Sequence, residues 1–370
     1  MQAELVESSK QAAPRDPARS SPRVLILRAG AIGDTLMATP LVRALRRTFP
    51  AAYLVFLCSR QAHDVLRYNP HLDEVTSLGY RHLSPWLSFE KLRALRHLRK
   101  LNLDWALVLE SHRDFTDLAR RARPARLIGY GDLGVGERSD RAAFDPHRHS
   151  SENHLMAAQS LGVQPAGADM ELYYPGALDE TLRLRLARLG IQEGERLVGV
   201  HPGWGGRKHP PEDTRLRSWP AHRFADVVRW LFTRARARVL LTGAREDRTL
   251  TDLIARLSGV SCLNLAGELS LLELAAVVRR LDLYLTVDSG PAHMAAALGT
   301  PLVTLWGPGI FEQTAPLAGR GPVRILHHRV PCAPCYGTPL MKSCQDNICM
   351  KQIEVGEVCS SIEQLLAPPK

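Results

Sequence analysis

Short apolar runs alternate with stretches of helical periodicity along most of this chain. Because the runs carry Val, Ile and Leu at consecutive positions, they are typical of strands buried on both faces of a parallel sheet. Strands are predicted at 23–27, 53–57, 105–109, 126–130, 197–201, 238–242, 262–265, 283–287 and 301–305. Helices are predicted at 35–48, 90–100, 152–161, 221–235, from 246 onward, 271–281 and 294–298. This alternation indicates an α/β fold with crossover helices.

The strands and helices form two series, separated by a loop-rich stretch that ends near residue 176. We therefore expect a disordered tail over 1–22, a Rossmann-like doubly wound domain over 23–176, a second over 177–358 and a C-terminal tail over 359–370. Each series starts with a strand that enters a glycine-containing turn and a helix. Ligands of such sheets bind at the carboxyl ends of the strands. Two domains facing a central cleft, each with one ligand, are expected.

Composition and charge exclude several classes of protein. The 370 residues are 45% hydrophobic, and no run of about eighteen uncharged apolar residues predicts a transmembrane helix. The N-terminus lacks an apolar signal segment, and seven unevenly spread cysteines do not resemble a disulfide framework, so a cytoplasmic protein is expected. A net charge of +10 suits an acidic ligand or peripheral contact with the anionic inner face of the cell membrane. Without an aromatic-interleaved basic platform or a DNA-binding motif, nucleic acid is not an expected partner.

The turn after strand 283–287 reads Asp288-Ser289-Gly290-Pro291-Ala292-His293 and leads into an Ala-rich helix. A helix N-terminus leaves backbone N–H groups unpaired and carries a partial positive charge, so it favours a phosphate. The sequence therefore predicts a nucleotide-phosphate site here. An ordinary α/β loop with Ser289 as the helix N-cap is the alternative.

The turn after the first strand differs from a dinucleotide-binding fingerprint. That fingerprint needs a glycine at position 28, where this chain has Arg28, and an acidic residue after the second strand, where it has Arg60. Arg60 would suit NADP, so an NADP-dependent oxidoreductase stays as an alternative. The turn also places Asp34 at the mouth of a helix, where its carboxylate can act as a general base on an alcohol. A first-turn Asp that only stabilises the helix dipole is the alternative for this residue.

Three motifs, in order, resemble those of the ADP-heptose:lipopolysaccharide glycosyltransferases, glycosyltransferase family 9. The segment Arg28–Asp34 after a strand resembles the N-terminal motif of that family. The turn Val287–His293, with Leu305–Pro308 after the next strand, is similar to its C-terminal signature. Between them, Ser218-Trp219-Pro220 looks like the family's Lys-x-Trp-Pro segment. The resemblance extends over about residues 23–358, nearly the whole chain.

The resemblance implies a GT-B fold and an inverting, metal-independent transfer of a heptose from ADP-heptose to a saccharide or glycolipid acceptor, such as lipopolysaccharide core. It implies no catalytic cofactor. The N-terminal domain would face the acceptor, with Asp34 as the general base and Gly33 beside it, and the C-terminal domain would bind the ADP-sugar donor. Carried over by motif, the donor-binding residues are Glu246, Asp288, Ser289, Gly290, Pro291 and His293.

One position departs from the family pattern. Where the family has a phosphate-contacting Lys two residues before Trp-Pro, this chain has Arg217, and Lys208 in the preceding loop is the alternative phosphate contact. The departure supports a second hypothesis, a degenerate nucleotide-sugar-binding module without turnover. His112 and Arg113 follow the strand 105–109, where an acceptor-side loop is expected, so they are candidate acceptor contacts.

Near the C-terminus, Cys332, Cys335, Cys344 and Cys349 form the pattern C-x2-C-x8-C-x4-C. Four thiolates can close a tetrahedron around Zn or Fe, so a structural metal site is one interpretation. Free or redox-labile thiols are the other. Any metal there would be structural, because these residues lie far in sequence from the proposed chemistry.

Overall fold

The computed structural model describes residues 21–79, 88–110, 112–130, 139–204 and 216–367. The chain divides into an N-terminal unit, Met1–Asp145 with Ser151–Gly167, and a C-terminal unit, Ala168–Lys370 with Pro146–Ser150. The contact boundary after Gly167 thus precedes the loop end at 176 that the sequence pattern indicates. None of the helices in these described ranges has the length and apolarity needed to span a membrane.

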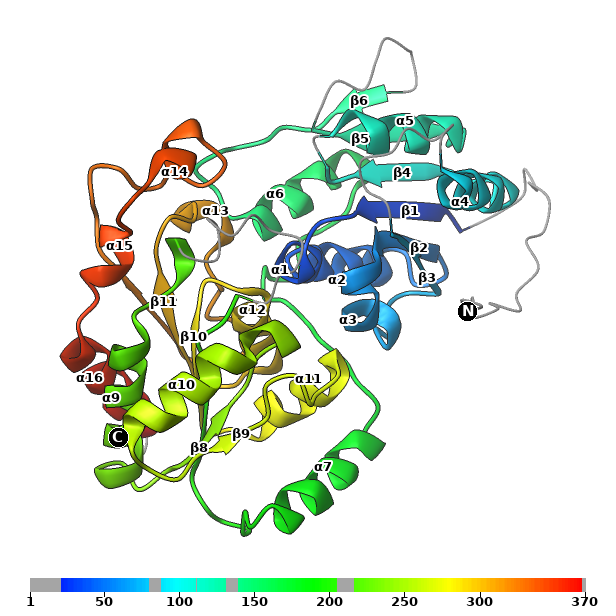
Figure 1. Ribbon diagram of the computed structural model, residues 1–370. Coiled ribbons are helices and arrows are strands. Elements are labelled where there is room, and N and C mark those ends of the chain that lie inside the picture. Colours follow the sequence, from blue (N-terminus) through cyan, green and yellow to red (C-terminus); the bar gives the residue numbers. More distant parts are fainter. Residues whose placement is uncertain (1–20, 80–87, 111, 131–138, 205–215, 368–370) are drawn as a thin grey trace. The chain divides into compact units, whose positions relative to one another are not determined.

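The N-terminal unit contains a six-stranded sheet in the order β3-β2-β1-β4-β5-β6, with every neighbouring pair parallel. Figure 1 shows its strands in blue to teal. The strands are β1 Arg23–Arg28, β2 Tyr53–Ser59, β3 Glu74–Leu78, β4 Trp105–Val108, β5 Arg126–Gly129 and β6 Ser139–Arg141. Residues 24–27 of β1 are wholly buried, so the unit's core lies around its central strands.

Helices cross between these strands, as the alternating pattern predicts. They are α1 Ile32–Leu36, α2 Thr39–Thr48, η1 Arg60–Ala62, α3 His63–Arg67, α4 Phe89–Lys100, α5 Arg113–Arg121, α6 Ser150–Ala157 and η3 Gln159–Leu161. The single helix predicted over 35–48 is wrong, because the structure has two helices there. Pro40, in the first turn of α2, has no backbone N–H to donate to the carbonyl of Leu36. The Thr39 hydroxyl donates to that carbonyl instead, at 2.7 Å.

The C-terminal unit repeats the same topology. Its six strands lie in the order β12-β11-β10-β7-β8-β9, again all parallel. They are β7 Leu197–His201, β8 Arg238–Leu241, β9 Leu263–Asn264, β10 Leu283–Val287, β11 Leu302–Trp306 and β12 Val323–His327. Numbered within each unit, both sheets have the order 3-2-1-4-5-6 of a Rossmann-like doubly wound fold, so that prediction is confirmed.

The C-terminal unit contains further helices after residue 298, which the sequence pattern did not predict. The helices of this unit are α7 Ala177–Arg188, α9 Ala221–Thr233, η4 Arg245–Asp247, α10 Arg248–Ser258, α11 Leu271–Arg280, α12 Gly290–Leu298, α13 Phe311–Thr314, α14 Pro339–Ser343, α15 Ile348–Lys351 and α16 Val355–Leu366. Residues 359–366, expected to lie in a tail, belong to α16. That helix buries Val358 and Ile362 in the core of the C-terminal unit.

Both sheets have a switch point, where the chain reverses the direction in which strands are added. It lies between β1 and β4 in the N-terminal unit and between β7 and β10 in the C-terminal unit. Loops that leave the carboxyl ends of these strands diverge there and form the binding crevice of doubly wound folds. Asp34 follows β1 and Asp288 follows β10, so both candidate sites belong to switch points.

Candidate functional site

The N-terminal candidate site is built on the turn after β1. Asp34 lies in the first turn of α1, where its Oδ2 accepts the backbone N–H of Ala31 at 2.9 Å. Its Oδ1 accepts a hydrogen bond from Arg28 Nη2, also at 2.9 Å. A side chain at Gly30 would collide with this carboxylate, so the turn requires glycine there. Asp34 is thus oriented by two donors, yet its side chain remains 32% exposed and can reach a ligand.

Arg28 links this turn to the end of β4 through a partner, Glu110, that was not predicted from the sequence. Arg28 Nη1 lies 3.2 Å from Glu110 Oε2 and donates to the carbonyl of Leu109 at 3.0 Å. Burial disfavours the charged guanidinium, but Asp34 and Glu110 outweigh burial and raise the pKa of Arg28 above its usual value. Among the described residues, neither Arg28 Nε nor Glu110 Oε1 has a hydrogen-bond partner. A fixed cation between two carboxylates therefore occupies the switch point of the first sheet.

The three expected acceptor residues lie in α1 or at the start of α5 and have different environments. His112 is the N-cap of α5, and its Nδ1 accepts the backbone N–H of Asp114 at 3.3 Å. The His112 side chain is 50% exposed, and Arg113 is exposed on the first turn of α5. Gly33 is buried within α1. His112 therefore stabilises the start of α5 as its N-cap, independently of any contact with an acceptor.

The C-terminal candidate site begins at the carboxyl end of β10. Ser289 is the N-cap of α12, but its hydroxyl makes no capping bond to the helix and instead pairs with Thr286 Oγ1 at 3.1 Å. The alternative that the Ser289 side chain caps the helix is therefore wrong, because its hydroxyl does not bond to the helix backbone. Gly290 and Pro291 form the first turn, and His293 is 5% exposed within the buried helix.

Arg217 reaches this turn from the segment before α9. Its Nη1 lies 3.0 Å from Asp288 Oδ2, and both side chains are at most 10% exposed. The guanidinium carbon lies 4.3 Å from the ring centroid of Trp204 and 4.3 Å from that of Tyr336. Arg217 Nε is buried and has no hydrogen-bond partner among the described residues. The residue that departs from the family's Lys thus lies in the candidate site.

Close packing shapes the turn around Asp288. The loop after β11 brings Gly309 against it, and a side-chain carbon at Gly309 would lie 2.6 Å from Asp288 Oδ2 and 2.9 Å from the Trp306 ring. The Trp306 indole N–H donates to the carbonyl of Gly309 at 3.2 Å, which holds the loop in place. The residues of the C-terminal signature therefore also pack against one another in the structure.

Glu246 lies in η4 after β8 and is exposed, so its carboxylate is accessible to a ligand. Its neighbour Asp247 is buried and accepts the backbone N–H of Ala244 at 2.8 Å. This repeats the local geometry of Asp34 and Ala31, and both turns have the pattern Gly-Ala-x-x-Asp. The repeated pattern is the signal by which the sequence could have identified Asp247. Lys208, the alternative phosphate contact, lies outside the described residues.

The four cysteines of the C-terminal pattern are all free. Burial, assisted by the nearby thiols of Cys335, Cys332 and Cys344, raises the pKa of Cys349 to about 11. Across the described ranges, no three His, Cys, Asp or Glu side chains are arranged to hold a metal ion. In this arrangement the four thiols do not form a closed metal site.

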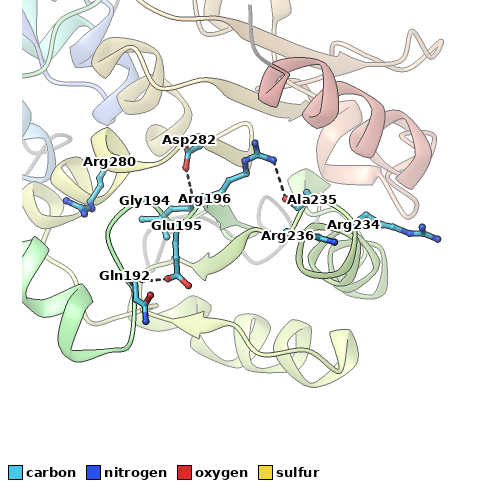
Figure 2. Close-up of a pocket in the computed structure, with 10 residues that line it drawn as sticks. Gln192, Gly194, Glu195, Arg196, Arg234, Ala235, Arg236, Arg280 and Asp282 are labelled. Carbon is cyan, nitrogen blue, oxygen red and sulfur yellow. Dashed lines mark hydrogen bonds between the residues drawn. The ribbon is translucent and has the colours of Figure 1, made fainter.

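A cavity of about 820 Å³ lies at the opposite end of the second sheet. Its lining includes Leu197 at the start of β7, Ala235 just before β8 and Asp282 just before β10. Figure 2 shows Arg280 and Arg234 pointing away from one another across this region. The cavity is at the amino ends of the strands, away from the switch point, so it is not part of the candidate site.

Known glycosyltransferases are similar to this chain in sequence. Residues 212–343, which include Arg217, Asp288 and the first two cysteines of the pattern, match the model of glycosyltransferase family 9 (heptosyltransferase). Lipopolysaccharide heptosyltransferase 2 of Salmonella typhimurium is 25% identical over 322 residues, which cover 83% of this chain and 90% of the relative. These matches support glycosyltransferase family 9 as the family that the chain resembles. The chain is therefore a glycosyltransferase, which excludes the NADP-dependent oxidoreductase.

Solved structures agree with this assignment at the level of the fold. A family 9 glycosyltransferase from Veillonella parvula superposes with a TM-score of 0.76 at 20% identity, covering 93% of this chain and 97% of the other. The E. coli ADP-heptose lipopolysaccharide heptosyltransferase II gives a TM-score of 0.71 at 20% identity, covering 93% and 98%. This glycosyltransferase has the GT-B fold that the resemblance implied.

Proposed function

We propose that this glycosyltransferase transfers a heptose from ADP-heptose to a saccharide or glycolipid acceptor, with lipopolysaccharide core as the expected acceptor class. The observation that carries the proposal is the buried Arg217–Asp288 pair at the start of α12, at the switch point of the second sheet. Arg217 supplies a cation, and the first turn of α12 supplies the positive end of a helix, which together suit a diphosphate. The names of the relatives, which are heptosyltransferases, support the sugar.

The proposed reaction is a direct displacement that inverts the anomeric carbon. Asp34 accepts the proton of an acceptor hydroxyl as its oxygen attacks that carbon, and ADP leaves from the opposite face. Negative charge grows on the leaving diphosphate, where Arg217 and the first turn of α12 stabilise it. Further donor contacts proposed from the motifs are Glu246 at the ribose, Lys208 at a phosphate, and Ser289, Gly290, Pro291 and His293 around the diphosphate and sugar.

On the acceptor side, Gly33, His112 and Arg113 are the proposed contacts, because they lie next to Asp34 or follow β4. A basic side chain such as Arg113 suits an acceptor that carries phosphates or carboxylates. We propose a cytoplasmic protein, and its net charge of +10 would suit peripheral contact with the anionic inner face of the membrane. A binding module without turnover is the second candidate, since Arg217 replaces the family's Lys and already has a carboxylate partner.

Titration calorimetry with ADP-heptose, GDP-sugars and UDP-sugars tests the proposed donor. We expect the protein to bind ADP-heptose selectively and to transfer heptose to core oligosaccharide that lacks this sugar. Binding of ADP-heptose without transfer to any saccharide or glycolipid acceptor would favour the binding module. Preference for a GDP- or UDP-sugar would contradict the proposed donor.

We further propose that transfer needs no metal, because Arg217 and a helix terminus can carry the charge that a divalent cation would otherwise neutralise. Transfer measured after exhaustive treatment with EDTA should equal transfer in added Mg²⁺. Whether the four cysteines bind a metal is tested separately, by elemental analysis of the purified protein. Zn or Fe bound there would be structural, so its removal should lower the melting temperature. A rate that falls with chelation and returns with Mg²⁺ would contradict metal independence.

A further inference from the structure

The cysteine-rich segment, Cys332–Cys349, contacts the candidate donor site through one aromatic side chain. Tyr336 lies between the first two cysteines and α14, and its ring centroid is 4.3 Å from the guanidinium carbon of Arg217. Trp204, which follows β7, lies at the same distance. An arginine held over two aromatic rings keeps its charge in a region that excludes water, because the ring quadrupoles attract the cation. The sequence analysis assigned no part in donor binding to this segment.

The backbone of the segment is tied to the same turn. The N–H groups of Cys335 and Tyr336 both donate to the carbonyl of Pro308, at 3.1 and 3.0 Å. Pro308 precedes Gly309, whose backbone packs against the carboxylate of Asp288. The position of the Tyr336 ring is therefore coupled to the loop that also places Asp288, the ion-pair partner of Arg217.

A second side chain of the segment fixes the backbone on both sides of Arg217. The amide of Asn347 donates to the carbonyl of Leu216 at 3.2 Å and to that of Ser218 at 2.8 Å. Leu216 also packs in a small apolar cluster with Cys335 and Met341. The same segment therefore contacts Arg217 in two places. Asn347 bonds the backbone on either side of it, and Tyr336 packs against its guanidinium.

We propose that the cysteine-rich segment forms a wall of the donor site, where Tyr336 and Trp204 position the Arg217 guanidinium for the diphosphate of a nucleoside diphosphate. The inference rests on the proposed function, since it concerns the same donor. Asp288 accepts from one end of the guanidinium, while the buried Arg217 Nε has no partner among the described residues and is a suitable donor to a phosphate oxygen. Tyr336 is a positioning residue because it acts through Arg217.

Three ligands and three variants test this proposal in the full-length protein. ADP, AMP and adenosine are titrated into wild type, Tyr336→Leu, Tyr336→Phe and the control Leu340→Ala. Leu removes the aromatic face at similar volume, whereas Phe keeps it. Leu340 is an exposed apolar side chain of the same segment, at 52% exposure. We expect Tyr336→Leu to weaken ADP binding roughly tenfold, with adenosine binding unchanged, and Tyr336→Phe and Leu340→Ala to match wild type.

Comparing ADP with adenosine, and Tyr336→Leu with Leu340→Ala, separates a loss of Arg217 positioning from general damage to the protein. An equal loss of ADP and adenosine affinity in Tyr336→Leu, or a loss in Leu340→Ala as large as in Tyr336→Leu, would overturn the inference. ADP affinity retained in Tyr336→Leu would overturn it as well, with the proposed donor intact. A wild-type protein that binds neither ADP nor ADP-heptose would overturn the proposed function and the inference together.

Discussion

Replacement of Asp34 by Asn should abolish sugar transfer while ADP binding stays at the wild-type level. A positioned general base contributes roughly 10²- to 10⁴-fold to a rate, and Asn cannot accept the acceptor proton. Asn is close to Asp in size, so it retains the carbonyl oxygen that can accept from Ala31 N–H. Asp34 belongs to the N-terminal unit and the nucleotide-binding candidates to the C-terminal unit, so the binding of ADP should not change. The measurement is kcat at saturating donor beside an ADP titration.

A matched control is available for the alternative that Asp34 only stabilises a helix. Asp64 is likewise an acidic residue in the first turn of a short helix, α3, and its side chain is exposed. Asp64→Asn removes the same favourable interaction with a helix dipole but no proposed catalytic group, so its kcat should match wild type. If Asp34→Asn and Asp64→Asn kept the same activity, Asp34 would not be the base.

The N-terminal site is expected to survive this substitution as a folded structure. Arg28 keeps its contact with Glu110 and its hydrogen bond to Leu109 when the Asp34 charge is removed. Asp247 offers a comparison within the same chain, since it caps its turn as Asp34 does but is 7% exposed and packs against Gly203. The shared capping geometry therefore explains the local fold of both turns. Asp34 combines this geometry with a partly exposed carboxylate that accepts a hydrogen bond from Arg28, whereas Asp247 is buried.

Hydrophobic patterning predicted the central strands of both sheets but not three at or near the edges. β1 and β10 are buried on both faces and therefore have continuous apolar runs. β3 and β6 have few apolar residues and are only partly buried, because an edge strand packs on fewer neighbours. β12, at the edge of the second sheet, has the sequence Val-Arg-Ile-Leu-His and is likewise partly buried. The apolar pattern is therefore strongest where a strand is buried on both faces, although it also predicted the partly buried edge strand β9.

The residues of the candidate site that could be predicted from the sequence are those that follow a strand. Asp34 and Asp288 both come directly after a buried strand or in the helix that follows it, so the sequence locates them at the ends of sheets. Glu110 and Tyr336 matter through Arg28 and Arg217, and these contacts join segments far apart in the chain. No local pattern encodes such a pair. The strand order has to bring β1 beside β4 before Arg28 can meet Glu110.

Replacement of Arg217 by Met should both destabilise the C-terminal unit and remove ADP binding. The pair with Asp288 is nearly inaccessible to water, so loss of the cation leaves a buried carboxylate without compensation. Breaking a buried pair in this way costs about 3–5 kcal/mol of unfolding free energy. The affinity for ADP should fall roughly a hundredfold, because charge-assisted hydrogen bonds to the diphosphate are lost. Scanning calorimetry and ADP titration measure the two effects.

The double variant Arg217→Met/Asp288→Leu separates stability from binding. Removing both charges eliminates the uncompensated carboxylate, and apolar side chains of similar volume can replace a buried ion pair at little cost. The melting temperature should therefore return most of the way to wild type, whereas ADP binding should stay absent because no cation remains for the diphosphate. Arg183→Met, which breaks an exposed pair with Glu180 on α7, should change neither quantity. A double variant that is stable and binds ADP like wild type would show that Arg217 and Asp288 serve the fold alone, and the donor's phosphates would have to bind elsewhere.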